Sequence, residues 1–254
     1  MNTWQENILP VNRAQRKPDV HSNKEEGQDT VILVFSRTPG EEASAKTFYP
    51  QAGRIGNIQI ADRLISHTIE TAHKTHLPVI VKYSDDQNGH TFGQRLANAI
   101  EEVFALGFKR VLSIGNDCPD ITTQLLLEAH HQLHDKNLVL GPAFDGGVYL
   151  IGISKSAYHR QQFVELSWES AELQSTWQNY ALTFVEELCW LGYYGDIDQS
   201  TDFSYYLASL PERNLLRRQL LNILVTSHQS GAVYQQTYAI TPLITDAPLR
   251  APPC

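Results

Sequence analysis

Short continuous apolar runs alternate along this chain with longer segments of helical periodicity. The first run, residues 31–35, has five apolar residues in succession, as in strands of a parallel sheet that are buried on both faces. Helical segments are recognised by apolar residues that recur every three to four positions. The alternation continues with strands predicted at 77–83 and 110–115 and helices predicted at 57–76, 92–106 and 121–133.

The rest of the chain has a less regular pattern. Residues 36–56 are polar and rich in Pro, Gly and charge, so we predict a loop there. Residues 241–254 carry four prolines and are typical of an extended tail. The other predicted elements are strands at 138–140, 148–153 and 187–191, helices at 171–180, 201–210 and 212–226, and a strand or extended arm at 233–240.

Strands that alternate with helices predict βαβ units. We therefore expect an α/β fold with a mostly parallel central sheet and helices on both of its faces. Residues 1–29 lack a periodic apolar pattern and are expected to form a flexible polar tail. The main domain is expected over 30–210. A C-terminal helix and an extended tail, 211–254, would pack on it or beside it.

Composition narrows the possible partners. The 254 residues are 42% hydrophobic and 19% charged, which is usual for a globular protein. With 20 basic and 28 acidic residues, the net charge of −8 argues against broad binding to nucleic acid. No apolar run is long enough for a membrane span, and the first 29 residues lack the apolar core of a secretion signal. Three widely spaced cysteines favour a reduced, cytoplasmic protein.

The ends of the predicted strands carry candidate chemistry, because ligands of open α/β sheets bind outside the carboxyl ends of the strands. After the first strand come Ser36, Arg37 and Pro39, and then Lys46. An arginine and a lysine in such a loop can hold phosphate oxygens. The alternative is a solvated loop with ordinary charges, which the spacing alone favours.

The end of the strand at 110–115 offers a possible metal ligand. Asp117 follows Asn116 at the strand tip, where a carboxylate can coordinate Mg²⁺ or Mn²⁺. The alternative is that an aspartate here only caps the next helix, a role that suits Asp120 better because it directly precedes that helix. Cys118, between Asp117 and Pro119, is expected to be a buried structural residue.

The segment 141–149 carries two adjacent glycines, Gly146 and Gly147, which allow a positive φ or the close approach of a ligand. A tight hairpin turn is the alternative, since Asp-Gly is typical of one. His130 and His134 lie one helical turn apart, but a solvated helix face explains them better than a metal site.

A late pair of carboxylates is a second candidate for the metal. Asp196 and Asp198 are two residues apart, so in an extended segment both point to the same side. We expect at least one of them to lie about 4–8 Å from Asp117, close enough to share an ion. The alternative is that both only order the turn. Asp202 fits the first turn of the following helix.

Taken together, several motifs resemble a known family. They are Phe35-Ser-Arg-Thr-Pro39, Gly93-Gln-Arg-Leu96, Gly115-Asn-Asp-Cys-Pro119, the run from Gly141 to Gly152, Leu166-Ser-Trp168 and Asp196-Ile-Asp198. In this order they resemble the bacterial group called domain of unknown function 2064, which is counted among the glycosyltransferase-A-like (GT-A) proteins. The resemblance covers roughly residues 31–208.

The resemblance implies a Rossmann-like GT-A fold that binds a nucleotide or a nucleotide-diphospho-sugar, an unknown small-molecule acceptor, and Mg²⁺ or Mn²⁺. It implies roles for residues named here by position. The nucleotide would contact Phe35, Ser36, Arg37, Pro39, Lys46, Arg95 and Asn116. The metal would contact Asp117, Asp196 and Asp198. The acceptor side would hold Asp145 as general base, together with Gly146, Gly147, Tyr149 and Trp168.

One departure from the family weakens the expected phosphate cradle. Many members carry a Lys-Thr-Arg-Leu run after the first strand, whereas this chain has Lys46-Thr47-Phe48 and lacks the arginine. The leading hypothesis is a metal-dependent glycosyltransferase that uses a nucleotide-diphospho-sugar. The alternatives are a nucleotidyltransferase acting on a small phosphorylated acceptor and a non-catalytic nucleotide-binding protein of the same fold.

Overall fold

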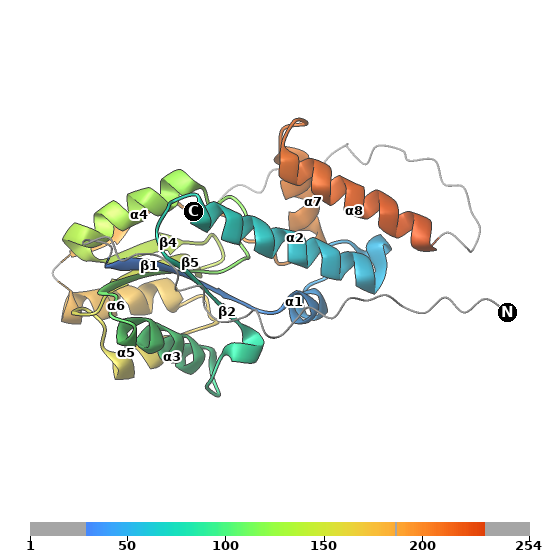
Figure 1. The fold of residues 1–254 in the computed structure, drawn as a ribbon. Coiled ribbons are helices and arrows are strands. Elements are labelled where there is room, and N and C mark those ends of the chain that lie inside the picture. Colours follow the sequence, from blue (N-terminus) through green and yellow to red (C-terminus); the bar gives the residue numbers. More distant parts are fainter. Residues whose placement is uncertain (1–28, 186, 232–254) are drawn as a thin grey trace, which may run out of the picture.

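A single twisted sheet forms the centre of the protein (Figure 1). The computed structural model describes residues 29–185 and 187–231. Within them the strand order is β2-β1-β3-β5-β4-β6, and β5 alone runs antiparallel to its two neighbours. The strands are β1 (Thr30–Ser36), β2 (Val79–Tyr83), β3 (Arg110–Ile114), β4 (Asn137–Pro142), β5 (Val148–Ser154) and β6 (Glu187–Trp190).

Helices cover both faces of this sheet, as the alternating pattern predicted. In Figure 1, α3, α5 and α6 lie below the sheet, and α2 and α4 lie above it. The helices are α1 (Pro39–Ala45), α2 (Gly53–His73), α3 (Phe92–Ala105), α4 (Thr123–Lys136), α5 (Arg160–Val164), α6 (Leu173–Phe184), α7 (Ser200–Ser209) and α8 (Leu215–Gly231), with short 3-10 turns at Pro50–Ala52 and Ser84–Asp86.

The continuous apolar run of β1 supplies both halves of the core. Val31, Leu33 and Phe35 point towards α3, α5 and α6, whereas Ile32 and Val34 point towards α4. All five side chains are at most 8% exposed. A strand with both faces buried needs apolar residues at every position, which explains why the run does not alternate with polar residues.

A third apolar cluster joins the C-terminal helices to α2. Phe48 and Phe203 pack edge to face, with ring centroids 5.9 Å apart, and both are almost fully buried. Leu216 and Leu220 of α8 lie in the same cluster. The helix predicted over 212–226 thus packs on the domain, although it begins at Leu215. Residues 1–28 and 232–254, with the tail, arm and extended segment predicted there, lie outside the described residues.

The prediction of a loop over 36–56 is wrong in part, because this segment contains α1. The Thr38 side chain caps the helix by accepting a hydrogen bond from the Glu41 backbone N–H at 3.4 Å. Pro39 begins α1, and Glu41 and Glu42 fall in its first turn, where negative charge is favoured. With seven residues and few apolar ones, the helix has no periodic stripe to reveal it. The five-residue α5 was missed for the same reason.

The glycine-rich segment between β4 and β5 closes an antiparallel hairpin, so the hairpin alternative holds. The backbone N–H of Ala143 donates to the Gly147 carbonyl at 2.9 Å. Gly146 has a φ of +97°, a conformation that favours glycine. The hairpin also explains why β5 breaks the parallel pattern of the sheet.

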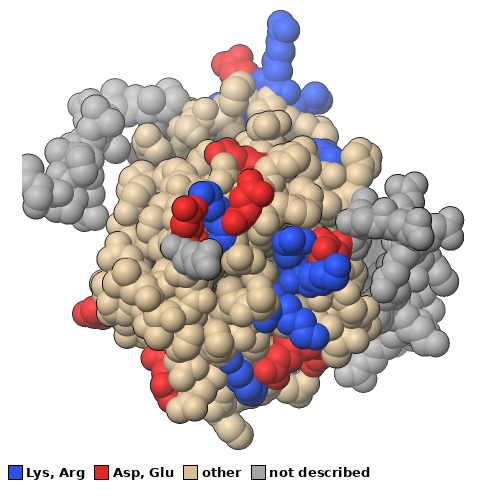
Figure 2. Space-filling model, turned by 90° about the vertical axis from the view of Figure 1, so that its left-hand side faces the viewer, with Lys and Arg blue, Asp and Glu red and all other residues tan. Residues whose placement is uncertain are grey.

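The surface carries mixed charges. On the face shown in Figure 2, Lys and Arg side chains lie beside Asp and Glu side chains, so this view shows no uniformly basic surface.

Among the described helices, none has the length and apolar character needed to cross a bilayer.

Close packing at α3 gives a first prediction. A Cβ atom on Gly93 would lie 2.5 Å from the indole of Trp168, which is held by a hydrogen bond from its Nε1 to the Phe163 carbonyl. We expect Gly93→Ala to lower the free energy of unfolding by about 1–3 kcal/mol, since overpacking forces neighbouring groups to shift. Urea denaturation measures this. Gly40→Ala is the matched control, because a Cβ atom at Gly40 meets nothing within 4 Å. Equal stability of the two variants would contradict the prediction.

Candidate functional site

The candidate site forms where the ends of β1 and β3 meet the segment that follows β6. Parallel strands bring their carboxyl ends to one edge of the sheet, so the residues after β1 and β3 become neighbours. The Ser36 hydroxyl donates to Asn116 Oδ1 at 2.9 Å, and both residues are buried. The backbone N–H of Ile197 donates to the Asp117 carbonyl at 2.8 Å and fixes the late segment beside β3.

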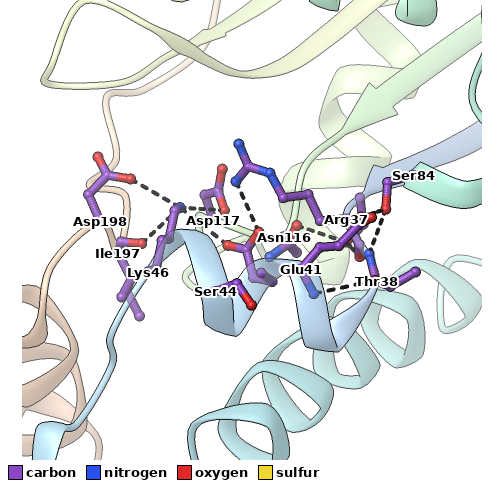
Figure 3. A network of polar contacts seen from close by, with 12 residues as sticks. Arg37, Thr38, Glu41, Ser44, Lys46, Ser84, Asn116, Asp117, Ile197 and Asp198 are labelled. Atoms are coloured by element: carbon purple, nitrogen blue, oxygen red, sulfur yellow. Dashed lines mark hydrogen bonds and ion pairs between the residues drawn. The ribbon is translucent and has the colours of Figure 1, made fainter. Parts of the chain in front are cut away.

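Lys46 is at the centre of the site (Figure 3). Its ammonium group, Nζ, lies 2.7 Å from Asp117 Oδ1 and 3.0 Å from Asp198 Oδ1. It also donates to the Ile197 carbonyl at 3.0 Å, and Glu42 Oε1 is 3.4 Å away. One cation thus joins α1, the tip of β3 and the segment before α7. The expected closeness of Asp117 and Asp198 is found, because both carboxylates contact the same nitrogen.

The Lys46 side chain is buried and has several charged groups around it. Its side chain is only 10% exposed. Burial by itself would lower the pKa of Lys46, but the negative charges of Asp117 and Glu42 outweigh this and raise the pKa above its ordinary value. The ammonium is therefore charged at every pH at which the protein would work.

Glu42 holds two cationic side chains, those of Arg37 and Lys46, close to each other. Its side chain is only 2% exposed, and its carboxylate contacts Arg37 Nη1 at 3.2 Å as well as Lys46 Nζ. Glu42 and Lys46 are four residues apart, so α1 and its end place them on one side. The Arg37 side chain is 48% exposed, which leaves its guanidinium accessible to a ligand.

Asp196 differs from the other acidic residues of the site. Burial, reinforced by the nearby negative charges of Asp117, Asp145 and Asp198, raises its pKa to about 7. Its Oδ1 is buried and has no hydrogen-bond partner among the described residues. A carboxyl group that exchanges its proton near neutral pH suits general acid–base chemistry.

Asp202 caps α7, as expected. Its carboxylate accepts hydrogen bonds from the backbone N–H groups of Gln199, at 2.9 Å, and Asp198, at 3.2 Å. This cap fixes the turn that presents Asp198 to Lys46.

Asp145 lies on the hairpin between β4 and β5 and is exposed. Its Oδ1 accepts a hydrogen bond from the Gly147 N–H at 2.8 Å, and a Cβ atom on Gly147 would lie 3.0 Å from the same oxygen. The two glycines therefore allow the turn that exposes Asp145 to solvent.

Cys118 is buried as predicted, with 2% of its surface exposed. Burial raises the pKa of its thiol, and the charges of Asp196 and Asp120 act in the same direction. The group therefore lacks the thiolate character of a nucleophile.

Several residues named from the sequence lie apart from the Lys46 cluster. The Phe35 ring is in the core against Phe92, with ring centroids 5.7 Å apart. Trp168 packs on Gly93 in the same core. Tyr149 is 5% exposed and donates to the Gly192 carbonyl. Their aromatic side chains are therefore structural in this arrangement.

The other two residues named from the sequence, Pro39 and Arg95, lie in helices and not in the aromatic core. Pro39 begins α1 and so places Glu42 and Lys46. Arg95 lies in the first turns of α3, and among the described contacts none joins its guanidinium to the cluster. The role of Glu42 could not be predicted from the sequence, because α1 is too short and polar to show a helical pattern.

The donor atoms around Lys46 suit a hard cation in chemical type, because carboxylate and carbonyl oxygens are the ligands that Mg²⁺ prefers. In the described residues, however, no group of three or more His, Cys, Asp or Glu side chains is arranged to hold a metal ion. The Lys46 ammonium contacts the oxygens of Asp117 and Asp198 instead. A divalent cation can use these oxygens only if Lys46 moves away from them.

The fold is shared with a solved protein from Desulfovibrio desulfuricans G20, which is provisionally described as a nucleotide-diphospho-sugar transferase. The two superpose with a TM-score of 0.67 at 22% identity, over 79% of this chain and 98% of the other. Residues 58–170 match the family of uncharacterized proteins conserved in bacteria known as domain of unknown function 2064. The match confirms, over these residues, the resemblance seen in the motifs.

More distant structures are also similar. Rv0371c from Mycobacterium tuberculosis H37Rv, solved in complex with manganese, has 13% identity and a TM-score of 0.39, over 71% of this chain and 99% of the other. A CMP:2-keto-3-deoxy-manno-octonic acid synthetase with CTP has 12% identity and a TM-score of 0.37, over 71% and 98%. No curated protein matches the sequence significantly.

The raised pKa of Asp196 predicts a dependence of stability on pH. Its folded-state pKa of about 7 lies above the ordinary aspartate value of 3.8, so the folded form retains a proton that the unfolded chain releases. The wild type therefore loses stability through this group as the pH rises from about 4 to about 7. We expect Asp196→Asn to remove that loss and to be about 1–3 kcal/mol more stable than wild type at pH 8, with little difference at pH 4.

Urea denaturation across this pH range makes the measurement. Asp145→Asn is the matched control, because that carboxylate is exposed and its loss relieves no burial. If wild type and Asp196→Asn depend on pH in parallel, Asp196 is not held in its protonated form.

Proposed function

We propose that this protein is a transferase that uses a nucleotide-diphospho-sugar as its donor. The observation that carries the proposal is the Lys46 cluster. A charged lysine and a half-exposed arginine, Arg37, converge at the carboxyl ends of the strands, where ligands of open α/β sheets bind. Fixed cations at the carboxyl ends of the strands suit a diphosphate. Its negative charge must be balanced when the donor binds and again when the nucleoside diphosphate leaves.

The carboxylates of the cluster hold these cations in place before the donor binds. Glu42 contacts both Arg37 and Lys46, so neither long side chain has to be ordered from solution when a phosphate arrives. Phosphate oxygens would compete with Asp117 and Asp198 for the Lys46 ammonium. Ser36 and Asn116 form the buried floor beneath them.

Glycosyl transfer also requires a group that accepts the proton of the acceptor. In the proposed reaction an acceptor hydroxyl oxygen bonds to the anomeric carbon, the bond from that carbon to the diphosphate oxygen breaks, and the nucleoside diphosphate leaves. Asp145 was the candidate base from the sequence. We now favour Asp196, since its pKa of about 7 and its unpartnered Oδ1 suit proton transfer better than an exposed carboxylate does.

Two alternatives concern the same site. A nucleotidyltransferase would break the bond between the α- and β-phosphates and release pyrophosphate. A non-catalytic nucleotide-binding protein would release nothing. The second is motivated by Phe48, which stands where many family members carry an arginine and whose ring is buried against Phe203. Arg37 and Lys46 would then be the cations left to hold the phosphates.

We also propose Mg²⁺ or Mn²⁺ as a cofactor, held by Asp117 and Asp198 with Asp196 nearby. A bound divalent cation would neutralise charge on the leaving diphosphate. Because Lys46 contacts two of these carboxylates, it excludes the ion until a diphosphate draws the ammonium away. The cation and the nucleotide should therefore bind together.

The donor proposal is tested with UDP- and GDP-linked sugars in the presence of Mn²⁺. We expect stabilisation of the wild type in thermal melts and release of nucleoside diphosphate. Lys46→Met should weaken nucleotide binding about tenfold or more, because it removes a charge-assisted contact. Lys155→Met replaces an exposed lysine outside the site and is the control. A parallel assay supplies a nucleoside triphosphate and a sugar phosphate, and pyrophosphate release there would favour the nucleotidyltransferase. Binding without turnover in either assay would favour the non-catalytic alternative.

The coupling of cation and nucleotide has its own test. Electron paramagnetic resonance reports free Mn²⁺ directly. We expect wild type to bind Mn²⁺ weakly alone and more tightly with UDP or GDP, whereas Lys46→Met should bind Mn²⁺ without nucleotide. Asp117→Asn should bind it poorly in both conditions, with its fold intact. Mn²⁺ binding by Asp117→Asn that equals wild type would contradict the proposed ligand.

A further inference from the structure

Two large aromatic side chains lie together on the surface next to the acidic part of the site. The Phe144 side chain is 75% exposed and Tyr193 is 55% exposed. Their rings are stacked, with centroids 5.6 Å apart and an interplanar angle of 26°. Exposed aromatic rings leave apolar area in water, so a stacked pair that remains exposed within residues 29–185 and 187–231 is a candidate contact for a ligand.

Backbone and side-chain hydrogen bonds fix the two segments that carry these rings. The Phe144 N–H donates to the Tyr194 carbonyl at 3.2 Å, so the hairpin and the segment after β6 are joined directly beneath the pair. Gln174 of α6 donates to the carbonyls of Ala143 and Gly147, at 2.8 and 2.9 Å. The Tyr193 hydroxyl also contacts the Gln174 side chain, at 3.3 Å. The pair is therefore held in place without a ligand.

The pair adjoins the carboxylates that face the site. Asp145 follows Phe144 in the hairpin, and a Cβ atom on Gly195 would lie 3.9 Å from the Phe144 ring. Asp196 comes next in the chain and is close enough to Asp145 for the two charges to interact. Three residues of extended chain span about 10 Å, so the Tyr193 ring and the Asp196 carboxylate lie on one short segment.

We propose that Phe144 and Tyr193 form a platform for a sugar ring of the acceptor. This inference rests on the proposed function and names the class of its second substrate, a carbohydrate. A pyranose has an apolar C–H face that packs on an aromatic ring, and it has hydroxyl groups around its edge. The carboxylates of Asp145 and Asp196 accept hydrogen bonds from such hydroxyls. Stacking and hydroxyl contacts would together direct one hydroxyl towards the donor.

The arrangement favours a carbohydrate over other ring-containing ligands. An acidic ligand would meet the negative charges of Asp145 and Asp198, and a phosphorylated acceptor would meet the same repulsion on this side of the site. The cations of the site, Arg37 and Lys46, follow β1, whereas the platform follows β4 and β6 at the same edge of the sheet. The platform side therefore suits a neutral, hydroxyl-rich molecule.

The test measures binding of acceptor analogues in the absence of a donor. Saturation-transfer NMR is recorded with methyl glycosides of glucose, galactose, mannose and N-acetylglucosamine, and with phenol as a planar ring without a sugar. We expect at least one glycoside to bind. Phe144→Ala and Tyr193→Ala should each weaken it about three- to tenfold, which corresponds to the loss of one aromatic contact. Tyr205→Ala is the matched control, because Tyr205 is 70% exposed on α7 and lies outside the pair.

The outcomes separate this inference from the proposed function. Glycoside binding that depends on the pair, in a protein that binds no nucleotide-sugar, would support the platform and contradict the donor. Donor binding without glycoside binding would overturn the platform alone. Binding of phenol but of no glycoside, or equal effects of Phe144→Ala and Tyr205→Ala, would also overturn it.

Discussion

The ion cluster around Lys46 is the interaction on which the site depends. Four groups from three parts of the chain contact one ammonium: Glu42, Asp117, and the neighbours Ile197, through its carbonyl, and Asp198. Each of the three carboxylates would repel the other two if Lys46 were removed. The ammonium therefore stabilises the fold locally and gathers the groups that the proposed chemistry needs. A ligand that binds one of these charged groups more strongly than its present partner does would therefore rearrange the cluster.

This arrangement gives a physical reason for the proposed coupling of cation and nucleotide. A diphosphate carries more negative charge than any one carboxylate of the cluster and can compete for Lys46. If the ammonium contacted phosphate, the oxygens of Asp117 and Asp198 would become free to hold a divalent cation. The site would then keep its charge balanced throughout, because each negative group keeps a positive neighbour.

The two sides of the site differ in character. After β1, Arg37 and Lys46 present positive charge, held in place by the buried Glu42. After β4 and β6, the stacked rings of Phe144 and Tyr193 stand beside Asp145 and Asp196. A donor with a charged diphosphate and a neutral, hydroxylated acceptor would bind on opposite sides, with their reacting groups directed towards each other.

The amino-acid sequence by itself determined the fold class, the family resemblance and most of the elements. Local patterns carry this information, since the apolar run of β1 and the helical periodicity of α2, α3 and α4 report burial directly. Lys46, Asp117 and Asp198 were also recognised as candidates, from their motifs.

Only the tertiary structure decided how these residues act together. Glu42 lies in a short polar helix with no apolar stripe and Lys46 follows at its end, so no pattern showed that the two side chains meet. Phe35 and Trp168 looked like ligand contacts in their motifs, but Phe35 is buried in the core and Trp168 is partly buried against it, whereas Phe144 and Tyr193 are exposed. The direction of an aromatic side chain depends on which segments pack beside it, and those segments lie far apart in the sequence.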